Sequence, residues 1–277
     1  MNIIALGPEG TNGHSVALRA QALYTADSSA SIEFVDTNDG VLKRVGQGLD
    51  LGVVPIENGW EGWVREVVRY WLGTGKKPCV IGEVHVPIVH QLLAHPSVTD
   101  ISQIRAVISH PQALGQCMGM LESFGIAETI AEKSTALAAK KVASGELKPD
   151  VAALAAPIAG QVYGLNVLKN HMEDDRENTT RFHVVGAKPR LPSGNDKTAL
   201  LFFTQNKPRA LVSALGCIET NMLTIHSIPR GQIGVFAFYV EFDGHMLDTE
   251  GRNTMKRLEK VTDNRIVLGS FPKELRS

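Results

Sequence analysis

Short apolar segments alternate with segments of helical apolar spacing along the first two thirds of this 277-residue chain. The apolar segments lie at 2–6, 32–35, 51–54, 106–109 and 151–154, and the helical ones at 14–24, 40–45, 64–72, 112–124, 136–142 and 157–163. Repeated alternation of a strand with a helix is typical of α/β folds, in which helical connections return each strand parallel to the last. The pattern therefore predicts an α/β domain built on a largely parallel sheet.

A stretch of Pro, Gly and polar residues at 186–196 interrupts this pattern and is the best candidate for a linker between domains. We place the boundary near residue 190. Beyond it the sequence predicts strand, helix, strand, strand, helix and strand, at 199–203, 210–218, 223–227, 235–242, 254–261 and 266–269. This is the βαββαβ order of ferredoxin-like domains.

The composition argues against several other classes of protein. A net charge of −1 gives no sign of the basic patch that nucleic acid requires, and no apolar stretch is long enough for a signal peptide or a membrane span. Cys79, Cys117 and Cys217 are isolated in the sequence, which favours reduced thiols over disulfides or a zinc site. We therefore expect a cytoplasmic protein that binds neither membranes nor nucleic acid.

Four short motifs with polar residues follow predicted strands. They are GPEGT at 7–11, VPIEN at 54–58, SHPQAL at 109–114 and ENTTRF at 177–182. Open α/β sheets bind ligands beyond the carboxyl ends of their strands, so these motifs are expected to meet in one cleft. GPEGT alone would be an ordinary turn, and only its coincidence with the other three motifs favours a site.

Two predicted helices begin with residues suited to a helix start, one of them within the third motif. Pro111 suits the first position of one helix, and Ser134 with Thr135 precedes the next. The unpaired amides of such helix starts could hold the carboxylates of a small dianion if both face the cleft, and plain capping is the alternative. His110, beside a proline at a helix start, fits a structural role better than that of a base.

The order and spacing of the four motifs resemble those of the prephenate dehydratases. The tail resembles an ACT domain, the amino-acid-sensing module usually fused to these enzymes, including its closing VLGSFP at 267–272. The resemblance covers nearly the whole chain. It implies a two-lobed catalytic domain at 1–188, similar to periplasmic binding proteins and with a central cleft, and an ACT domain at 196–277. Lobe one would comprise about 1–76 and 162–188, and lobe two about 77–161.

The resemblance implies that the chain converts prephenate to phenylpyruvate in phenylalanine biosynthesis. Loss of carbon dioxide and hydroxide makes the substrate ring aromatic and supplies most of the driving force, so neither a metal nor an organic cofactor is expected. Thr180 matches the threonine to which the family assigns hydrogen-bond donation to the departing hydroxyl. Asn58, Ser109 and Gln112 match further active-site positions that orient the substrate.

Arg181 has two expected roles that the sequence leaves equally open. It would either pair bidentately with a substrate carboxylate or fix its own loop. The remaining expected substrate contacts are Thr11, Thr135 and Phe182.

Three cleft positions depart from the family pattern. Asn12 and Gly13 stand where the family usually has Phe-Ser, and Gly59 stands where it usually has serine. These changes motivate an alternative, a prephenate decarboxylase of specialised metabolism that does not aromatise the ring, although the retained Thr180 argues against it. A second alternative is a non-catalytic small-molecule sensor, because fold alone does not establish chemistry.

The tail departs further from its family. ACT domains of this kind usually carry GALV and ESRP, where this chain has RALV at 209–212 and HSIP at 226–229. Arg209 would obstruct the approach of a ligand to the backbone or offer it a new charged contact. Regulation by phenylalanine is therefore open, as is a purely subunit-pairing role, and the family implies a homodimer or homotetramer. The candidate effector contacts are Ala210, Leu211, Val212, Asn221 and Ser227.

Overall fold

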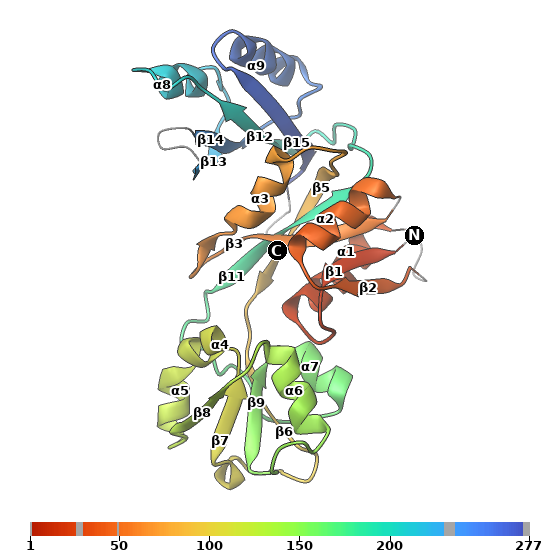
Figure 1. The fold of residues 1–277 in the computed structure, drawn as a ribbon, viewed down its shortest axis with the longest axis vertical. Coiled ribbons are helices and arrows are strands. Elements are labelled where there is room, and N and C mark those ends of the chain that lie inside the picture. Colours follow the sequence, from red (N-terminus) through yellow and green to blue (C-terminus); the bar gives the residue numbers. More distant parts are fainter. Residues whose placement is uncertain (1, 26–29, 49, 230–235, 274–277) are drawn as a thin grey trace.

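The protein consists of three β-sheets that follow one another along its long axis (Figure 1). The structure is a computed structural model that describes residues 2–25, 30–48, 50–229 and 236–273. The first two sheets carry helices and form two lobes, and the third is built from the C-terminal part of the chain. The fold is therefore α/β with two lobes and a separate C-terminal sheet, as the sequence predicts.

The first sheet has a parallel half and an antiparallel half. β1 (Ile3–Leu6) lies between β2 (Ile32–Val35) and β3 (Leu51–Asn58), and all three are parallel. β11 (Thr179–Gly186) then lies antiparallel between β3 and β5 (Cys79–Pro87). A distant segment of the chain is thus inserted beside the strand that carries the VPIEN motif.

The helices of the first lobe bury apolar faces against this sheet. Thr37 caps the helix at Asn38–Gln47 by accepting a hydrogen bond from the Gly40 amide, which satisfies a donor of the first turn. The buried positions Val41, Leu42 and Val45 recur at helical spacing. The elements are α1 (Asn12–Tyr24), α2 (Asn38–Gln47), α3 (Arg65–Leu72) and the short β4 (Gly62–Trp63), which pairs with the end of β3.

The second sheet lies in the other lobe. Its strands are β6 (Gln91–Ala94), β7 (Ala106–Ser109), β8 (Glu128–Ala131), β9 (Val151–Ala155) and β10 (Asn166–Lys169), in the order β10-β6-β9-β7-β8. β7 is parallel to both β8 and β9, whereas β6 is antiparallel to β9 and β10.

Four α-helices accompany the second sheet. The helix expected at 112–124 is in fact two helices, because Cys117 leaves the helical conformation with ψ near 10°. Ser134 caps the helix at Thr135–Ala143 by accepting a hydrogen bond from the Leu137 amide. The helices are α4 (Pro111–Gln116), α5 (Met118–Ser123), α6 (Thr135–Ala143) and α7 (Pro157–Tyr163), with a 3-10 turn at Ile101–Gln103.

The third sheet has the predicted βαββαβ connectivity. β12 (Asp196–Phe203), β13 (Met222–Pro229), β14 (Phe236–Asp243) and β15 (Asn264–Pro272) are all antiparallel, in the order β13-β14-β12-β15. Helices α8 (Ala210–Leu215) and α9 (Thr249–Glu259) contribute to a core on one face of the sheet. In the described part of the chain, no helix combines the length and apolarity needed to cross a membrane.

The first and third sheets share one hydrophobic core. Tyr239 and Phe271 belong to the same buried cluster as Trp71 of α3. A Cβ atom on Gly269 would lie 2.0 Å from the carbonyl oxygen of Val80, so the backbones of β15 and β5 are in direct contact there. The linker therefore joins two parts that are packed tightly together.

The structure corrects two expectations about the lobes. Neither sheet is largely parallel, because the chain crosses between the lobes twice and the strands beside the crossings run antiparallel to their neighbours. In addition, β5 belongs to the first sheet and β10 to the second. The crossings therefore lie at 88–90 and 170–178, whereas the sequence placed the lobe limits near 77 and 162.

The variant Gly269→Ala tests the contact between β15 and β5. It is expected to lower the free energy of unfolding by more than ~2 kcal/mol, because the new methyl group must displace the Val80 backbone. Gly115→Ala is the matched control, since a Cβ on Gly115 meets no atom within 4 Å. Urea unfolding followed by circular dichroism compares the two. Equal stability of the variants would contradict the close approach of the backbones.

Candidate active site

A cavity of about 400 Å³ lies between the two lobes. The end of β1 and strands β3 and β11 form one side of it, and the starts of α4 and α6 form the other. Lobe one contributes Asn12, Asn58, Thr180 and Phe182, and lobe two contributes His110, Gln112, Gln116 and Thr135. Three of the four motifs therefore meet at this cavity. The fourth motif, at 7–11, does not line it, although its neighbours Leu6 and Asn12 do.

Thr180 and Asn58 form the centre of its polar lining. The two residues are directly paired across β11 and β3. The side-chain amide of Asn58 donates to Thr180 Oγ1 over 2.7 Å and to Asn178 Oδ1 over 3.0 Å. Its own oxygen accepts from the backbone amides of Trp60 and Glu61, which fixes the orientation of the amide group. Because Thr180 Oγ1 receives this hydrogen bond, its proton remains available to donate to a ligand.

The alternation of β11 separates Thr180 from Arg181. Neighbouring side chains of a strand point to opposite faces, so Thr180 and Phe182 line the cavity and Arg181 faces away from it. Arg181 instead pairs with Glu57, Glu83 and Glu241. Of its two expected roles, the geometry favours the structural one, because Arg181 lines a different cavity from Thr180.

Thr11 and Ser109 are near the cavity but do not line it. Ser109 is fully buried and donates to the carbonyl of Leu154 over 2.6 Å, which ties β7 to β9. The hydroxyl of Thr11 donates to the carbonyl of Pro8 over 3.0 Å, in the turn before α1. These two residues shape the strand ends that carry the site, and the expected direct contacts are replaced by backbone hydrogen bonds.

The three unusual positions lie in different surroundings. Asn12 lines the cavity. A Cβ on Gly13 would approach the Leu6 carbonyl to 3.0 Å, so a larger residue there would crowd the end of β1. Gly59 lines a second cavity on the other side of β3, next to Arg181. Only the change at Asn12 therefore alters the surface that a ligand in the first cavity would meet.

His90 and Gln116 belong to the lining but were missing from the predicted contacts. They are 3% and 5% exposed, and His90 Nε2 lies 3.1 Å from Gln116 Oε1. Within the described residues, His90 Nδ1 and Gln116 Nε2 have no hydrogen-bond partner. Gln116 follows Gln112 by four residues on α4, so helical spacing could have revealed it. His90 lies in a lobe crossing, where no periodic pattern points to it.

The start of α6 supplies donors on the opposite side. Ser134, Thr135 and the neighbouring Lys133 line the cavity. The first amides of a helix lack intrahelical acceptors and carry partial positive charge, so this end of α6 favours an anionic group. His110 serves as the N-cap of α4, where its Nδ1 accepts from the Gln112 amide over 3.3 Å. The structural role expected for His110 is thus present, on a residue that also lines the cavity.

The candidate effector contacts do not gather in one place. Ala210 and Leu211 line a separate cavity of about 110 Å³ beside α8, whereas the side chain of Val212 is exposed. Asn221 donates to the Asp243 carboxylate, and Ser227 is exposed on the edge strand β13. Arg209 precedes α8 with φ at 66°, the left-handed region that glycine adopts most easily. A backbone preference therefore explains the usual glycine without any appeal to a ligand.

This geometry defines a class of protein: a two-lobed α/β protein with a cleft between its lobes and a ferredoxin-like C-terminal domain. A family model described as prephenate dehydratase matches residues 3–190. A bifunctional chorismate mutase/prephenate dehydratase from Aquifex aeolicus is 32% identical and aligns with 99% of this chain and 74% of its own length. The chain belongs to the prephenate dehydratase family.

Solved structures agree with this assignment. A prephenate dehydratase from Arthrobacter aurescens in complex with L-Phe superposes with a TM-score of 0.84 at 29% identity, covering 98% of this chain and 90% of the other. A chain described as GqqA, a novel type of quorum quenching acylase, superposes with a TM-score of 0.85 at 25% identity. The match covers 99% of this chain and 98% of the other. The fold is thus shared with a protein to which a different chemistry is attributed.

Buried histidines make the stability of the protein depend on pH. Burial lowers the pKa of both His90 and His183 below their ordinary value of about 6.5. As the pH falls below that value, the unfolded chain takes up protons that the folded rings do not. The free energy of unfolding is therefore expected to decrease between pH 6.5 and 5, by at most about 1.4 kcal/mol per pH unit for each ring.

Urea unfolding at a series of pH values measures this slope. His90→Gln should make it shallower, because one of the two rings is removed. An unchanged slope in that variant would contradict the buried neutral state of His90.

Proposed function

We propose that this protein catalyses the decarboxylating dehydration of prephenate to phenylpyruvate, a step of phenylalanine biosynthesis. One observation carries the proposal: the Asn58 amide donates to Thr180 Oγ1, which leaves the threonine proton for a hydroxyl group in the cavity. Membership of the prephenate dehydratase family supports the same reaction.

The reaction needs little from the protein beyond orientation and one donor. As the ring carboxylate leaves as carbon dioxide, its bonding electrons enter the ring and the ring hydroxyl departs. Thr180 donates a hydrogen bond to the oxygen of that hydroxyl and stabilises the negative charge that develops on it. Aromatisation supplies the driving force, so a weak acid is sufficient in this position.

The lining fits the other groups of prephenate. Leu6, Val64, Ile88 and Phe182 give an apolar surface for the ring. The start of α6, with Lys133 and Thr135, is suited to a carboxylate. Burial keeps His90 neutral near pH 7 by lowering its pKa, so its unpaired Nδ1 and the unpaired Gln116 Nε2 are uncharged partners for the bound substrate.

The lining fits an acylase reaction less well. Acyl transfer by a threonine requires an adjacent base that takes the hydroxyl proton. The side chain that contacts Thr180 Oγ1 in this structure is the amide of Asn58, which donates a hydrogen bond and cannot accept that proton. Thr180 is therefore placed as a donor and not as a nucleophile.

Thr180→Val tests the donor role, because valine has the same shape without the hydroxyl. It is expected to lower kcat for phenylpyruvate formation by about 10²–10³-fold. Thr180→Ser keeps a donor and should retain activity within about tenfold of the wild type. Chromatography of the products from purified protein and prephenate measures both. Full activity of Thr180→Val would exclude the proposed mechanism.

The product itself separates the alternatives. A non-aromatic diene would identify a decarboxylase, and binding of prephenate without any turnover would identify a sensor. Phenylpyruvate as the product supports the dehydratase.

We further propose that the C-terminal domain pairs subunits and senses an amino acid, as the L-Phe complex of the Arthrobacter aurescens relative suggests. The cavity beside α8 is smaller than the ~300 Å³ of ordinary ligand sites, and a second copy of the chain packed against it would enlarge the enclosed site. Apolar side chains are exposed on α8 and on β13, which is an edge strand of its sheet. The exposed residues are Val212, Met222, Leu223 and Ile225.

Val212→Glu is expected to convert the wild-type oligomer to a smaller species, because it places a charge on the most exposed apolar residue of α8. Leu191→Glu is the matched control: Leu191 is 79% exposed in the linker and should leave the assembly unchanged. Sedimentation velocity measures the oligomeric state of both variants. Activity measured at increasing phenylalanine concentrations shows whether a variant that no longer assembles also loses its response to phenylalanine. A monomeric wild type would contradict the proposed pairing.

A further inference from the structure

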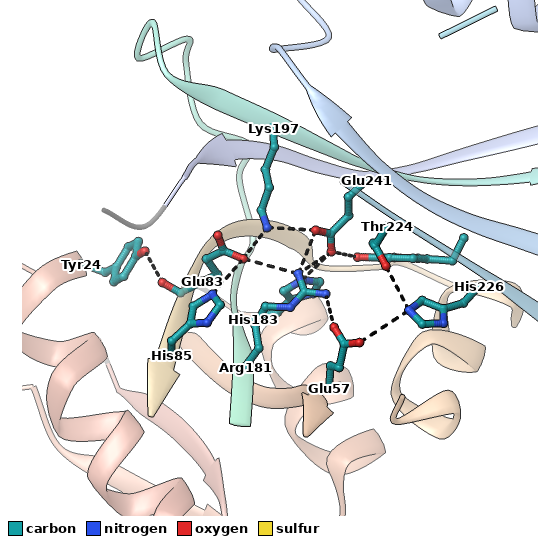
Figure 2. A network of polar contacts seen from close by, with 11 residues as sticks. Tyr24, Glu57, Glu83, His85, Arg181, His183, Lys197, Thr224, His226 and Glu241 are labelled. Carbon is teal, nitrogen blue, oxygen red and sulfur yellow. Dashed lines mark hydrogen bonds and ion pairs between the residues drawn. The ribbon is translucent and has the colours of Figure 1, made fainter. Parts of the chain in front are cut away.

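A cluster of buried charged side chains joins the third sheet to the first (Figure 2). Arg181 Nη1 lies 2.7 and 2.8 Å from the two carboxylate oxygens of Glu241. Lys197 Nζ lies 2.9 Å from Glu241 and 2.5 Å from Glu83. The side chains of these four residues are at most 10% exposed. Such burial makes each charge depend on its partners.

The cluster draws its members from both parts of the chain. Arg181, Glu57 and Glu83 come from β11, β3 and β5 of the first lobe, whereas Lys197 and Glu241 come from β12 and β14. Glu241 contacts both cations and also accepts from the Tyr239 hydroxyl. Burial opposes ionisation of Glu241, but the neighbouring His183, Arg181 and Lys197 outweigh it and hold the pKa well below the ordinary range. The C-terminal domain thus supplies one of the three carboxylates that pair with Arg181, and the one at the shortest distance.

The first-lobe members of this cluster are neighbours of the proposed reacting pair. Arg181 follows Thr180 on β11, and Glu57 precedes Asn58 on β3. The two strands are in register, so Arg181 is paired with Glu57 and Thr180 with Asn58. The Arg181–Glu57 ion pair, 3.1 Å long, lies on the face opposite the Thr180–Asn58 hydrogen bond. A shift of the β11 backbone at Arg181 would therefore also move Thr180, the preceding residue of the same strand.

A second contact connects the domains where β4 pairs with the end of β3. His226 of β13 stacks on Trp63 of β4 with ring centroids 4.1 Å apart, and its Nε2 lies 3.9 Å from Glu57 Oε1. A cavity of about 590 Å³ adjoins the cluster and is lined by Glu57, Arg181 and Glu241. The cluster is therefore fixed by its ion pairs on one side and has room to rearrange on the other.

We propose that Glu241 is a positioning residue for the reaction: through Arg181 it sets the place of Thr180, and so transmits the position of the C-terminal domain to the site. This inference rests on the proposed function of Thr180 as the hydrogen-bond donor. A displacement of a fraction of an ångström in a donor is sufficient to change a rate without changing how much substrate binds.

Glu241→Gln tests the inference because it keeps the shape of the side chain and removes its charge. We expect kcat to fall about tenfold or more, with KM for prephenate changed by less than about threefold. Asp243→Asn is the matched control, since Asp243 is two residues further along β14 and pairs with Lys273, outside the cluster. It should keep kcat within about twofold. Equal kcat in the two variants would overturn the inference.

Amide hydrogen exchange gives a readout that does not depend on activity. In Glu241→Gln, residues 179–182 should exchange faster than in the wild type, and in Asp243→Asn they should not. If the wild type does not convert prephenate, the proposed function fails, and the exchange data alone decide whether Glu241 holds β11. If Glu241→Gln does not fold, Glu241→Asp, which retains the charge on a shorter side chain, replaces it. Unchanged kcat and exchange in Glu241→Asp would overturn the inference.

Discussion

The pairing of β11 with β3 is the interaction on which the rest of the structure depends. It returns the chain from the second lobe into the first sheet, and its register sets Thr180 opposite Asn58 and Arg181 opposite Glu57. One face of this pair then lines the cavity between the lobes, and the other meets the C-terminal domain. A slip of one residue would exchange the two faces and place a guanidinium where a hydroxyl is required.

Much of the architecture could be predicted from the sequence because its parallel strands and helices obey simple periodicities. The partners of the crossing strands could not be predicted in the same way. In β5, Glu83 and His85 alternate with Val84 and Val86, which is a strand pattern, but the pairing of Glu83 with Arg181 and Lys197 involves residues far away in the chain. Buried charges that are satisfied only by distant residues cannot be recognised from local sequence.

The candidate site was also predictable only in part. The motifs predicted which strand ends and helix starts meet, and Thr180, Asn58, Gln112, Thr135 and Phe182 line the cavity. The direction of Arg181 was not predictable while 177–182 was regarded only as a motif, because the alternation argument needs residues 179–186 to be a strand. Ser109 and Thr11 show a second limit: hydroxyls next to a site are also used to hold its backbone.

The shared core of the first and third sheets determines which parts of the molecule are coupled, and the sequence does not reveal this coupling. A linker near residue 190 suggests three separate parts. However, the contact of Gly269 with Val80 and the common apolar cluster pack the C-terminal sheet tightly against the first lobe. The lobes are joined by the crossings at 88–90 and 170–178 and by direct contacts such as the hydrogen bond from the Tyr163 hydroxyl to the Glu9 carbonyl. The C-terminal sheet is therefore coupled to the first lobe through buried contacts, so a shift of that sheet acts first on β5 and β11, the strands it touches.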